Sequence, residues 1–368
     1  MPGPLQEFWQ MLQAGGLLAL GAGGLASFIL IFRRPSSLLP RAGLWSIPWN
    51  GWAVLAVFVI AMLAGSLMQS LLIAIGFFEA LYGPDFPLAL TDPGDDLQRH
   101  ASHLRGLWSQ TLAIPVQFVI IVAGLHFGTG ATLAQLGLSS HRLGTNYLLG
   151  YLGWLVLTPL SFAVFMAAIA LLTNQPQKHP LTDLGNLAGR RELIVFALNA
   201  ALLAPLLEEL LFRGILLPWL LQAESPQRDL FVPPLYRPHL CVGIAVVICL
   251  QTPAVSDAMQ RQRWGDLPAA LLPTFFILAL VPAFLLLPHS RRVRRLVRLP
   301  SIQAVSAILA NGILFAAVHA GVWPSPVPLF VLGTGLAWLA ARSRSIVPCI
   351  VVHALFNAIA VVFTLGQA

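Results

Sequence analysis

The sequence predicts an all-α, polytopic membrane protein, a bundle of about ten transmembrane helices. Hydrophobic residues make up 57% of the 368 residues and charged residues only 10%, whereas soluble proteins carry about 25% charged residues. Apolar runs recur along the chain, and connections rich in Pro, Gly and charge separate them. The arginines are scattered between these runs rather than gathered on one soluble surface, which argues against a nucleic-acid-binding protein.

The candidate spans are apolar runs, most of which approach the roughly 20 residues that a helix needs to cross a bilayer. No small-residue cleavage pattern follows the first run, so we interpret it as a span and not as a removable signal peptide. The sixth run is short and ends at Thr252-Pro253, so it is either re-entrant or continues as a tilted turn into 252–258. The runs lie near 15–32, 52–78, 111–128, 145–172, 194–221, 239–251, 267–287, 301–320, 326–341 and 346–365.

Basic residues set the expected orientation, because cytoplasmic loops of membrane proteins hold the excess of Lys and Arg. With an external N-terminus, thirteen basic residues fall in cytoplasmic connections and seven in the opposite ones. The densest basic run, RRVRRLVR at 291–298, is either a plain cytoplasmic anchor or a site for lipid phosphates or a partner. The three cysteines all fall in apolar segments, and we expect them to be small core residues.

A pair of glutamates stands inside the fifth run, in the stretch LLEELLFRG. They are the only acids that the sequence places inside a span, and Arg213 is the only base. Each charge costs roughly 2.5–3.5 kcal/mol at a helix centre, so it is retained where it is paired, faces water or does chemistry. Glu209 stands four residues before Arg213, which predicts an ion pair. Glu208 is turned about 100° away and has no local cation, which favours a general base or acid. We expect Pro205 to kink the helix and admit water.

Three further polar groups lie in the last apolar runs. The stretch FAAVH places Phe315 beside His319, and HALFN places His353 and Asn357 on one helix face. By helix rise, His319 lies near the far end of its run and His353 near the cytoplasmic end of its own. Bringing the two histidines to one depth therefore requires other helix boundaries or broken, tilted helices.

These groups have two chemical interpretations, and the sequence leaves both open. In one, Glu208, His319 and His353 bind zinc or another divalent metal, which leaves a coordination position for water. In the other, Glu208 and His319 activate a water directly, while His353 and Asn357 donate hydrogen bonds to a developing oxyanion. Both are hydrolysis. The structural alternative is that these side chains only hydrogen-bond between helices, as buried polar groups in membrane bundles do.

The three motifs EELLFRG, FAAVH and HALFN occur in this order over roughly residues 190–365. In this respect the chain resembles the CAAX protease and bacteriocin-processing family. These glutamate-dependent intramembrane proteases include the type II prenyl-protein endopeptidases and the Abi-type bacterial proteins. The site residues of the family correspond here to Glu208, Glu209, Arg213, His319, His353 and Asn357.

The resemblance implies an all-helical fold with the active site inside the bundle, and a peptide-bond hydrolase. It also implies a role for each site residue. The first glutamate and His319 activate water, the second glutamate pairs with the arginine, and His353 with Asn357 forms the oxyanion site. Whether a metal takes part stays open.

The chain is expected to divide into an N-terminal transmembrane region of four helices, 1–190, accessory to catalysis, and a protease core, 191–365. Family members usually have a modest connection between the glutamate helix and the histidine helix. Here the connection from Arg213 to Phe315 contains two extra spans. This inserted two-helix segment, at about 222–300, either preserves the parity of the helices that follow or caps the site and restricts substrate entry.

We therefore expect a multi-pass intramembrane endopeptidase, in a prokaryotic cell membrane, that hydrolyses a peptide bond of a membrane-associated protein or peptide. Its partners are then that substrate and the lipid bilayer, with no nucleic acid. The alternative from another class is a non-catalytic scaffold or a transporter that retains the polar site. A transporter would show related halves, and residues 1–190 contain no repeat of the motif region.

Overall fold

The computed structural model is all-helical, which confirms the predicted fold class. It describes residues 21–27, 29, 46–88, 96–139, 142–172, 189–222, 232–299 and 301–365, and these ranges contain no β-strand. The first expected span, 15–32, lies mostly outside the described residues, as do several of the basic residues counted for the orientation.

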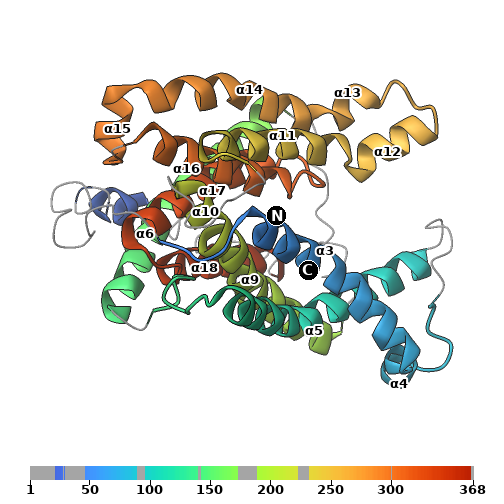
Figure 1. Cartoon of the computed structure of the whole chain (residues 1–368). Helices are drawn as coiled ribbons and strands as arrows, with labels where there is room; N and C mark the ends of the chain where they lie inside the picture. The colour runs from blue at the N-terminus through green and yellow to red at the C-terminus, as the bar shows by residue number, and fades with distance from the viewer. Residues whose placement is uncertain are drawn as a thin grey trace.

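The helices of the N-terminal half wrap the outside of the C-terminal half (Figure 1). Helix α3 starts after Asn50, whose side chain accepts a hydrogen bond from the Ala53 N–H and so caps the first turn. Helix α3 packs along α5, and α6 packs against α17 (Pro326–Ser343) and α18 (Val347–Leu365). The bounds are α3 Gly51–Ala74, α4 Phe77–Tyr82, α5 Asp96–Thr129 and α6 Leu143–Leu172.

The helix that carries the glutamate pair is continuous but irregular, because π-helical turns interrupt it twice. A π turn is rare and often marks a functional site. Each of these turns ends shortly before a proline, Pro205 or Pro218, whose missing N–H breaks the α-helical ladder. In order, the segments are α8 Arg190–Leu198, the π turn η1 Asn199–Leu203, α9 Ala204–Glu209, the π turn η2 Leu210–Leu216 and α10 Leu217–Leu221.

Both π turns are bound by an asparagine from another helix. Asn357 donates to the Ala200 carbonyl in η1, at 2.9 Å. Buried Asn311 donates to the Phe212 carbonyl in η2, at 2.8 Å. Each asparagine amide thus donates a hydrogen bond to a backbone oxygen that a regular α-helix would use internally. The two bonds join the glutamate helix to α16 (Ile302–Ala317) and to α18 (Val347–Leu365), on either side of the glutamates.

The predicted insertion forms a separate layer of helices at the top of Figure 1. Its helices α11 and α14 pack on α16. Helices α11 and α12 meet at a bend of 46° at Thr252-Pro253, and this bend fits both forms expected of the sixth run, a re-entrant segment and a tilted continuation. The helices of the insertion are α11 Arg237–Leu250, α12 Pro253–Gln260, α13 Leu267–Ala270, α14 Leu272–Leu286 and α15 Arg291–Val297. The helices that follow it are α16 Ile302–Ala317, α17 Pro326–Ser343 and α18 Val347–Leu365.

The described part of the chain contains five helices that are long and apolar enough to cross a membrane, or seven if each of two bent pairs counts as one span. The count of about ten is therefore not confirmed. The difference arises partly at the C-terminal end, because α16 qualifies only together with α15, and the apolar part of α18 is short, Val347–Val362. The five are Gly51–Ala74, His100–Thr129, Leu143–Leu172, Arg190–Leu221 and Leu272–His289.

The prediction that Arg213 is the only basic residue inside a span is wrong. Helix α5 starts well before the apolar run at 111–128, so the span His100–Thr129 includes Arg105. Arg105 is only 2% exposed and donates to the Pro87 carbonyl. A helix that extends beyond its apolar run thus carries a charge that the run does not reveal.

The glutamate pair is likewise not alone, because the span Arg190–Leu221 also contains Glu192, which is buried. Tyr82 donates to this carboxylate at 3.0 Å and accepts from the Trp108 indole at 2.8 Å. Burial raises the pKa of Tyr82, so the phenol stays a donor. Arg191 pairs with Glu192 at 2.7 Å. This cluster fastens α4 and α5 to the start of the glutamate helix.

Close helix contacts at glycines bind the two halves of the chain together. A Cβ at Gly150 of α6 would lie 2.6 Å from the Val351 Cβ of α18, and one at Gly335 of α17 would lie 2.4 Å from the Leu157 side chain of α6. One buried apolar cluster extends from Ile47 to Val352. The halves therefore share a core, and the division at residue 190 stays a prediction about function.

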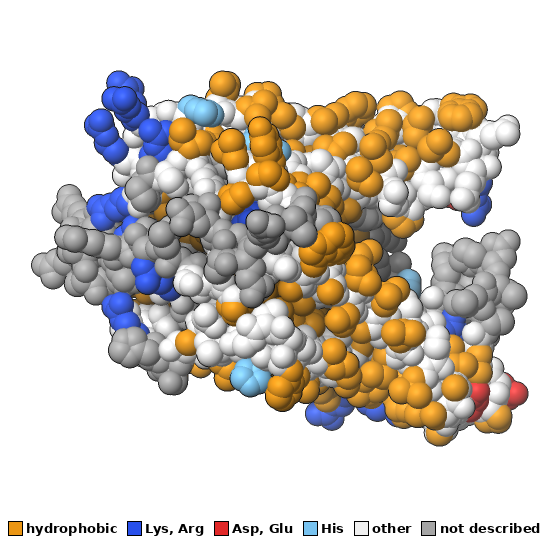
Figure 2. All heavy atoms as spheres, viewed as in Figure 1, with side chains coloured by type: hydrophobic (Ala, Val, Ile, Leu, Met, Phe, Trp, Pro, Cys, Tyr) orange, Lys and Arg blue, Asp and Glu red, His pale blue; other side chains and the backbone are white. Residues whose placement is uncertain are grey.

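Charged side chains gather at the two ends of the bundle (Figure 2). Arg291, Arg292, Arg295 and Arg298 are exposed around α15, and Asp85 is exposed beyond α4. Apolar side chains cover the surface between these ends. This distribution is that of a bundle whose helices run from one membrane face to the other.

Candidate active site

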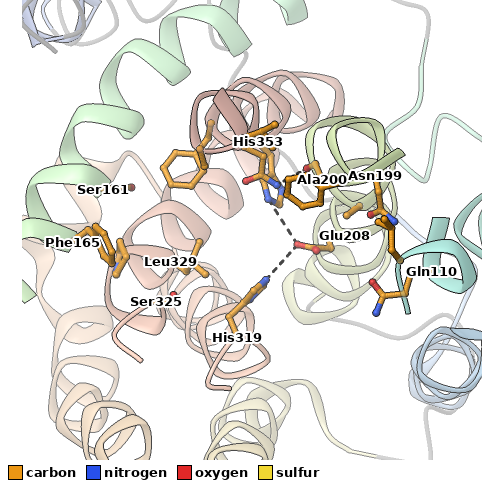
Figure 3. A pocket seen from close by; sticks show the side chains of 18 of the residues that line it. Gln110, Ser161, Phe165, Asn199, Ala200, Glu208, His319, Ser325, Leu329 and His353 are labelled. Carbon is orange, nitrogen blue, oxygen red and sulfur yellow. Dashed lines mark hydrogen bonds and ion pairs between the residues drawn. The ribbon is translucent and has the colours of Figure 1, made fainter. Parts of the chain in front are cut away.

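Glu208 lies between the two motif histidines (Figure 3). Its Oε2 atom is 3.9 Å from Nε2 of His319 and also 3.9 Å from Nε2 of His353. The Oε2 atom is buried and has no direct hydrogen bond. A separation of 3.9 Å exceeds hydrogen-bond range but suits one bridging water.

The other ring nitrogen of each histidine is held by an oxygen, which orients Nε2 toward Glu208. His319 Nδ1 lies 2.8 Å from the Phe315 carbonyl, which can only accept, so this nitrogen carries hydrogen. His353 Nδ1 lies 2.8 Å from Glu209 Oε1 and donates to it. When the rings are neutral, both Nε2 atoms therefore present lone pairs to the site.

Glu209 is fully buried and forms the centre of a closed ion cluster. Arg213 pairs with its Oε1 at 2.9 Å, as the four-residue spacing predicted. Arg213 also donates to the Gly333 carbonyl at 3.0 Å. The same carboxylate oxygen accepts a hydrogen bond from His353 Nδ1, a contact across 144 residues that no local spacing could indicate. Glu209 therefore neutralises the arginine and orients a site histidine.

Phe315 packs against the Arg213 guanidinium and both site imidazoles. The Arg213 guanidinium lies 4.3 Å from its ring centroid, in the range of a cation–π contact. The rings of His319 and His353 lie 4.9 Å and 5.7 Å from it. The sequence predicted only the contact with His319, and the structure adds the other two.

Asn357 lies one turn beyond His353 on α18 and lines the same cavity. Its amide donates to the Ala200 carbonyl in η1. An amide nitrogen carries two N–H groups, so this bond leaves one for another acceptor.

The histidines reach one depth because His319 lies in the turn after α16, whereas His353 lies in the second turn of α18. Both Nε2 atoms lie 3.9 Å from the same carboxylate oxygen, Glu208 Oε2. Of the two explanations offered by the sequence, a different helix boundary applies to His319, because α16 ends at Ala317 and not at residue 320.

The site opens into a cavity of about 590 Å³. Its lining includes Glu208, His319, His353 and Asn357, together with side chains from α5 and α6 that sequence reasoning missed, such as Leu107 and Phe162. Apolar residues in a span carry no signal that distinguishes a cavity wall from a lipid-facing surface. No described residue of the insertion lines this cavity, so the described part of the insertion does not cap it.

The donor set fits a divalent metal by its chemistry, since two imidazole lone pairs and one carboxylate oxygen face a common point. The spacing is wide, because donor atoms around tetrahedral zinc lie about 3.3 Å apart, given bonds of about 2.0–2.1 Å. Among the residues that the structure describes, no group of three or more His, Cys, Asp and Glu side chains has the arrangement of a formed metal site. Glu208, His319 and His353 would hold a metal only after drawing closer together.

Comparison with known families gives one match. Residues 190–359 match the family model described as type II CAAX prenyl endopeptidase, Rce1-like. These residues form a CAAX protease family domain. No curated protein and no solved structure matches the chain.

The CAAX protease domain contains all six predicted site residues, from Glu208 to Asn357, and the family match supports a protease. Helices α3, α5 and α6 lie outside the matched residues, yet α5 and α6 form walls of the cavity. The domain and the apolar helices together make this chain an integral, multi-pass membrane protein.

Proposed function

We propose that this protein is an intramembrane endopeptidase that hydrolyses a peptide bond of a membrane-associated protein or peptide. The observation that carries the proposal is the placement of Glu208 Oε2 at 3.9 Å from the Nε2 atoms of both His319 and His353, at the wall of a large cavity. The family match of residues 190–359 supports the reaction class.

In the proposed reaction, Glu208 and His319 activate the nucleophile. A water between them donates one hydrogen bond to Glu208 Oε2 and one to His319 Nε2, so its lone pair is free to attack the substrate carbonyl. As the new C–O bond forms, the water proton passes to Glu208. General base catalysis of this kind contributes about 10²- to 10⁴-fold in rate.

His353 and Asn357 stabilise the oxyanion. His353 can donate from Nε2 only as an imidazolium, because its Nδ1 proton is committed to Glu209. Asn357 supplies the second donor through the N–H that Ala200 does not use. When the C–N bond breaks, Glu208 returns its proton to the leaving amine.

A metal at the same residues would be held by Glu208, His319 and His353, and when bound it would polarise the carbonyl and acidify water. The cavity favours an apolar substrate segment, since Phe162, Phe165 and Phe356 line it. We further propose that the enzyme lies in a prokaryotic cell membrane, and prenylated substrates are then not implied.

The proposal is tested by comparing new protein termini in membranes of cells that make the wild type, Glu208→Ala or His319→Ala at matched abundance. A matched control is Asp85→Ala, which removes an exposed acid outside the cavity. We expect mass spectrometry to find termini that depend on Glu208 and His319 and persist in the control. The same termini in all four samples, with every variant folded, would overturn the proposal and favour a non-catalytic scaffold.

A further inference from the structure

A second cavity, of about 360 Å³, lies on the other side of Glu208. It is bounded by α3, α5 and the glutamate helix. Gly106, Gln110, Asn199, Ala204 and Glu208 line both cavities. Figure 3 shows Gln110 and Asn199 on one side of Glu208, with Ser161 and Phe165 across the first cavity on the opposite side. Glu208 therefore stands at the partition between two chambers.

The lining of the second cavity is polar, although both bounding helices are membrane spans. Ser66 and Gln69 of α3 and Ser109, Gln110 and Gln117 of α5 all line it. The Ser109 hydroxyl and the Gln117 carbonyl oxygen are buried, and neither has a hydrogen-bond partner among the described residues. Because an unsatisfied polar atom inside a membrane costs several kcal/mol, such a lining is stable when water occupies the space. A cavity of this size holds several waters.

The first cavity has the opposite character, since aromatic side chains from α6 and α18 line it. A substrate segment bound there covers Glu208 from that side and displaces water from it. The nucleophile consumed in each turnover must then reach Glu208 from elsewhere, and the second cavity adjoins the same carboxylate.

We propose that the cavity between α3 and α5 supplies the catalytic water. It holds water against Glu208 on the side away from the substrate, and Gln110 and Asn199 form the passage between the chambers. The inference rests on the proposed function for its catalytic part, whereas the presence of water in the cavity does not depend on catalysis.

Hydration is tested first, by cysteine labelling in native membranes. Ser66→Cys and Gln69→Cys place a thiol on the cavity, and Leu63→Cys and Leu67→Cys place one on the outward face of α3, where the leucines are 54% and 66% exposed. A charged methanethiosulfonate reagent needs a thiolate, which forms in water and not in lipid. The native cysteines are buried. We expect labelling at 66 and 69 and none at 63 and 67.

Delivery is tested by filling the cavity. Gly65 lines the second cavity but not the first, and a Cβ there meets no atom within 4 Å. The series Gly65→Ala, Gly65→Val and Gly65→Leu therefore reduces the space in steps. We expect kcat on a substrate found from the new termini to fall progressively, about tenfold for leucine, with KM unchanged. Gly124→Leu on α5 is the control, because its Cβ also meets nothing and it lines neither cavity.

The outcomes separate the two proposals. Equal labelling at the cavity and lipid positions, or none at 66 and 69, overturns the hydrated cavity. Labelling at 66 and 69 with wild-type kcat in folded Gly65→Leu overturns its role as the water supply. If Glu208→Ala retains cleavage, the proposed function fails and the water supply fails with it, while the labelling pattern still decides whether the cavity is wet.

Discussion

The two glutamates occupy neighbouring positions on one helix but belong to regions of opposite character. Glu209 and Arg213 are 0% exposed and form an ion pair, and with His353 they form a buried cluster. The Glu208 and His319 side chains are 27% and 33% exposed and approach each other without direct bonding. A helical turn of about 100° per residue separates these environments. Glu209 therefore stabilises the packing of the helices, while Glu208 is left available for chemistry.

The largest expected effect is on activity, at the open region. Glu208→Gln keeps the shape of the side chain but removes the base, so cleavage should slow by about 10²- to 10⁴-fold. Since Glu208 Oε2 makes no direct hydrogen bond to any residue that the structure describes, the thermal unfolding midpoint should stay near that of the wild type. Cleavage assays and thermal melts of the purified variant measure both. A variant that retains most of its rate would remove Glu208 from the reaction.

The next effect is on stability, at the closed region. Glu209→Gln leaves the buried Arg213 charge unpaired, which costs about 3–5 kcal/mol. Its melting temperature should therefore fall well below that of Glu208→Gln, the matched control one residue away. Equal thermal stability of the two variants would contradict the division between the regions.

The double variant Glu209→Gln with Arg213→Met sharpens this comparison. Removing both charges of a buried pair restores much of the stability that removal of one partner costs. His353 then still lacks its carboxylate, so cleavage should remain slow. Recovery of activity together with stability would show that Glu209 does not orient the histidine.

A smaller effect is expected where the regions meet, at Phe315. Phe315→Leu removes the ring that contacts Arg213 and both histidines, so we expect a loss of about 1–2 kcal/mol in stability. Cleavage should slow by about tenfold, since both imidazoles lose a positioning contact. Phe165→Leu, in the cavity wall on α6, is the control. Equal effects of the two variants would reduce Phe315 to an ordinary wall residue.

The smallest expected effect is that of metal removal. Because the donor atoms of the open region lie farther apart than metal ligands do, a chelator should change the cleavage rate by less than about twofold. Elemental analysis of the protein before and after treatment verifies removal. Lost activity that zinc restores would instead assign Glu208, His319 and His353 to a metal.

The sequence was most informative where membrane physics makes a residue conspicuous. Charged and polar groups in apolar runs are costly, which is why the glutamate pair and the two histidine motifs could be recognised and assigned to one site. The pairing of Glu209 with Arg213 followed from helix geometry alone.

What the sequence could not predict has equally physical reasons. The bond between His353 and Glu209 joins residues far apart in the chain, so no spacing reports it. The cavity wall on α6 includes apolar residues of an apolar span, such as Phe162 and Phe165. The wall residues on α5 lie before the apolar run at 111–128, where the sequence indicated a connection and not a helix. Arg105 was missed because a helix can continue beyond its apolar run. The count of about ten spans is not confirmed, partly because some apolar runs in the described part of the chain form helices shorter than a bilayer crossing.

The π turn η1 is the place where the glutamate helix can lose one residue without turning Glu208 away from the site. A π turn accommodates one residue more than the α turn it replaces. Deleting a single residue such as Ala201 would therefore return Asn199–Leu203 to regular α-helix and keep Glu208 in phase with Phe196 upstream. The same deletion in a regular α-helical turn would rotate Glu208 by about 100° relative to Phe196. Homologues that lack one residue in this turn are therefore expected to keep the six site residues facing one another.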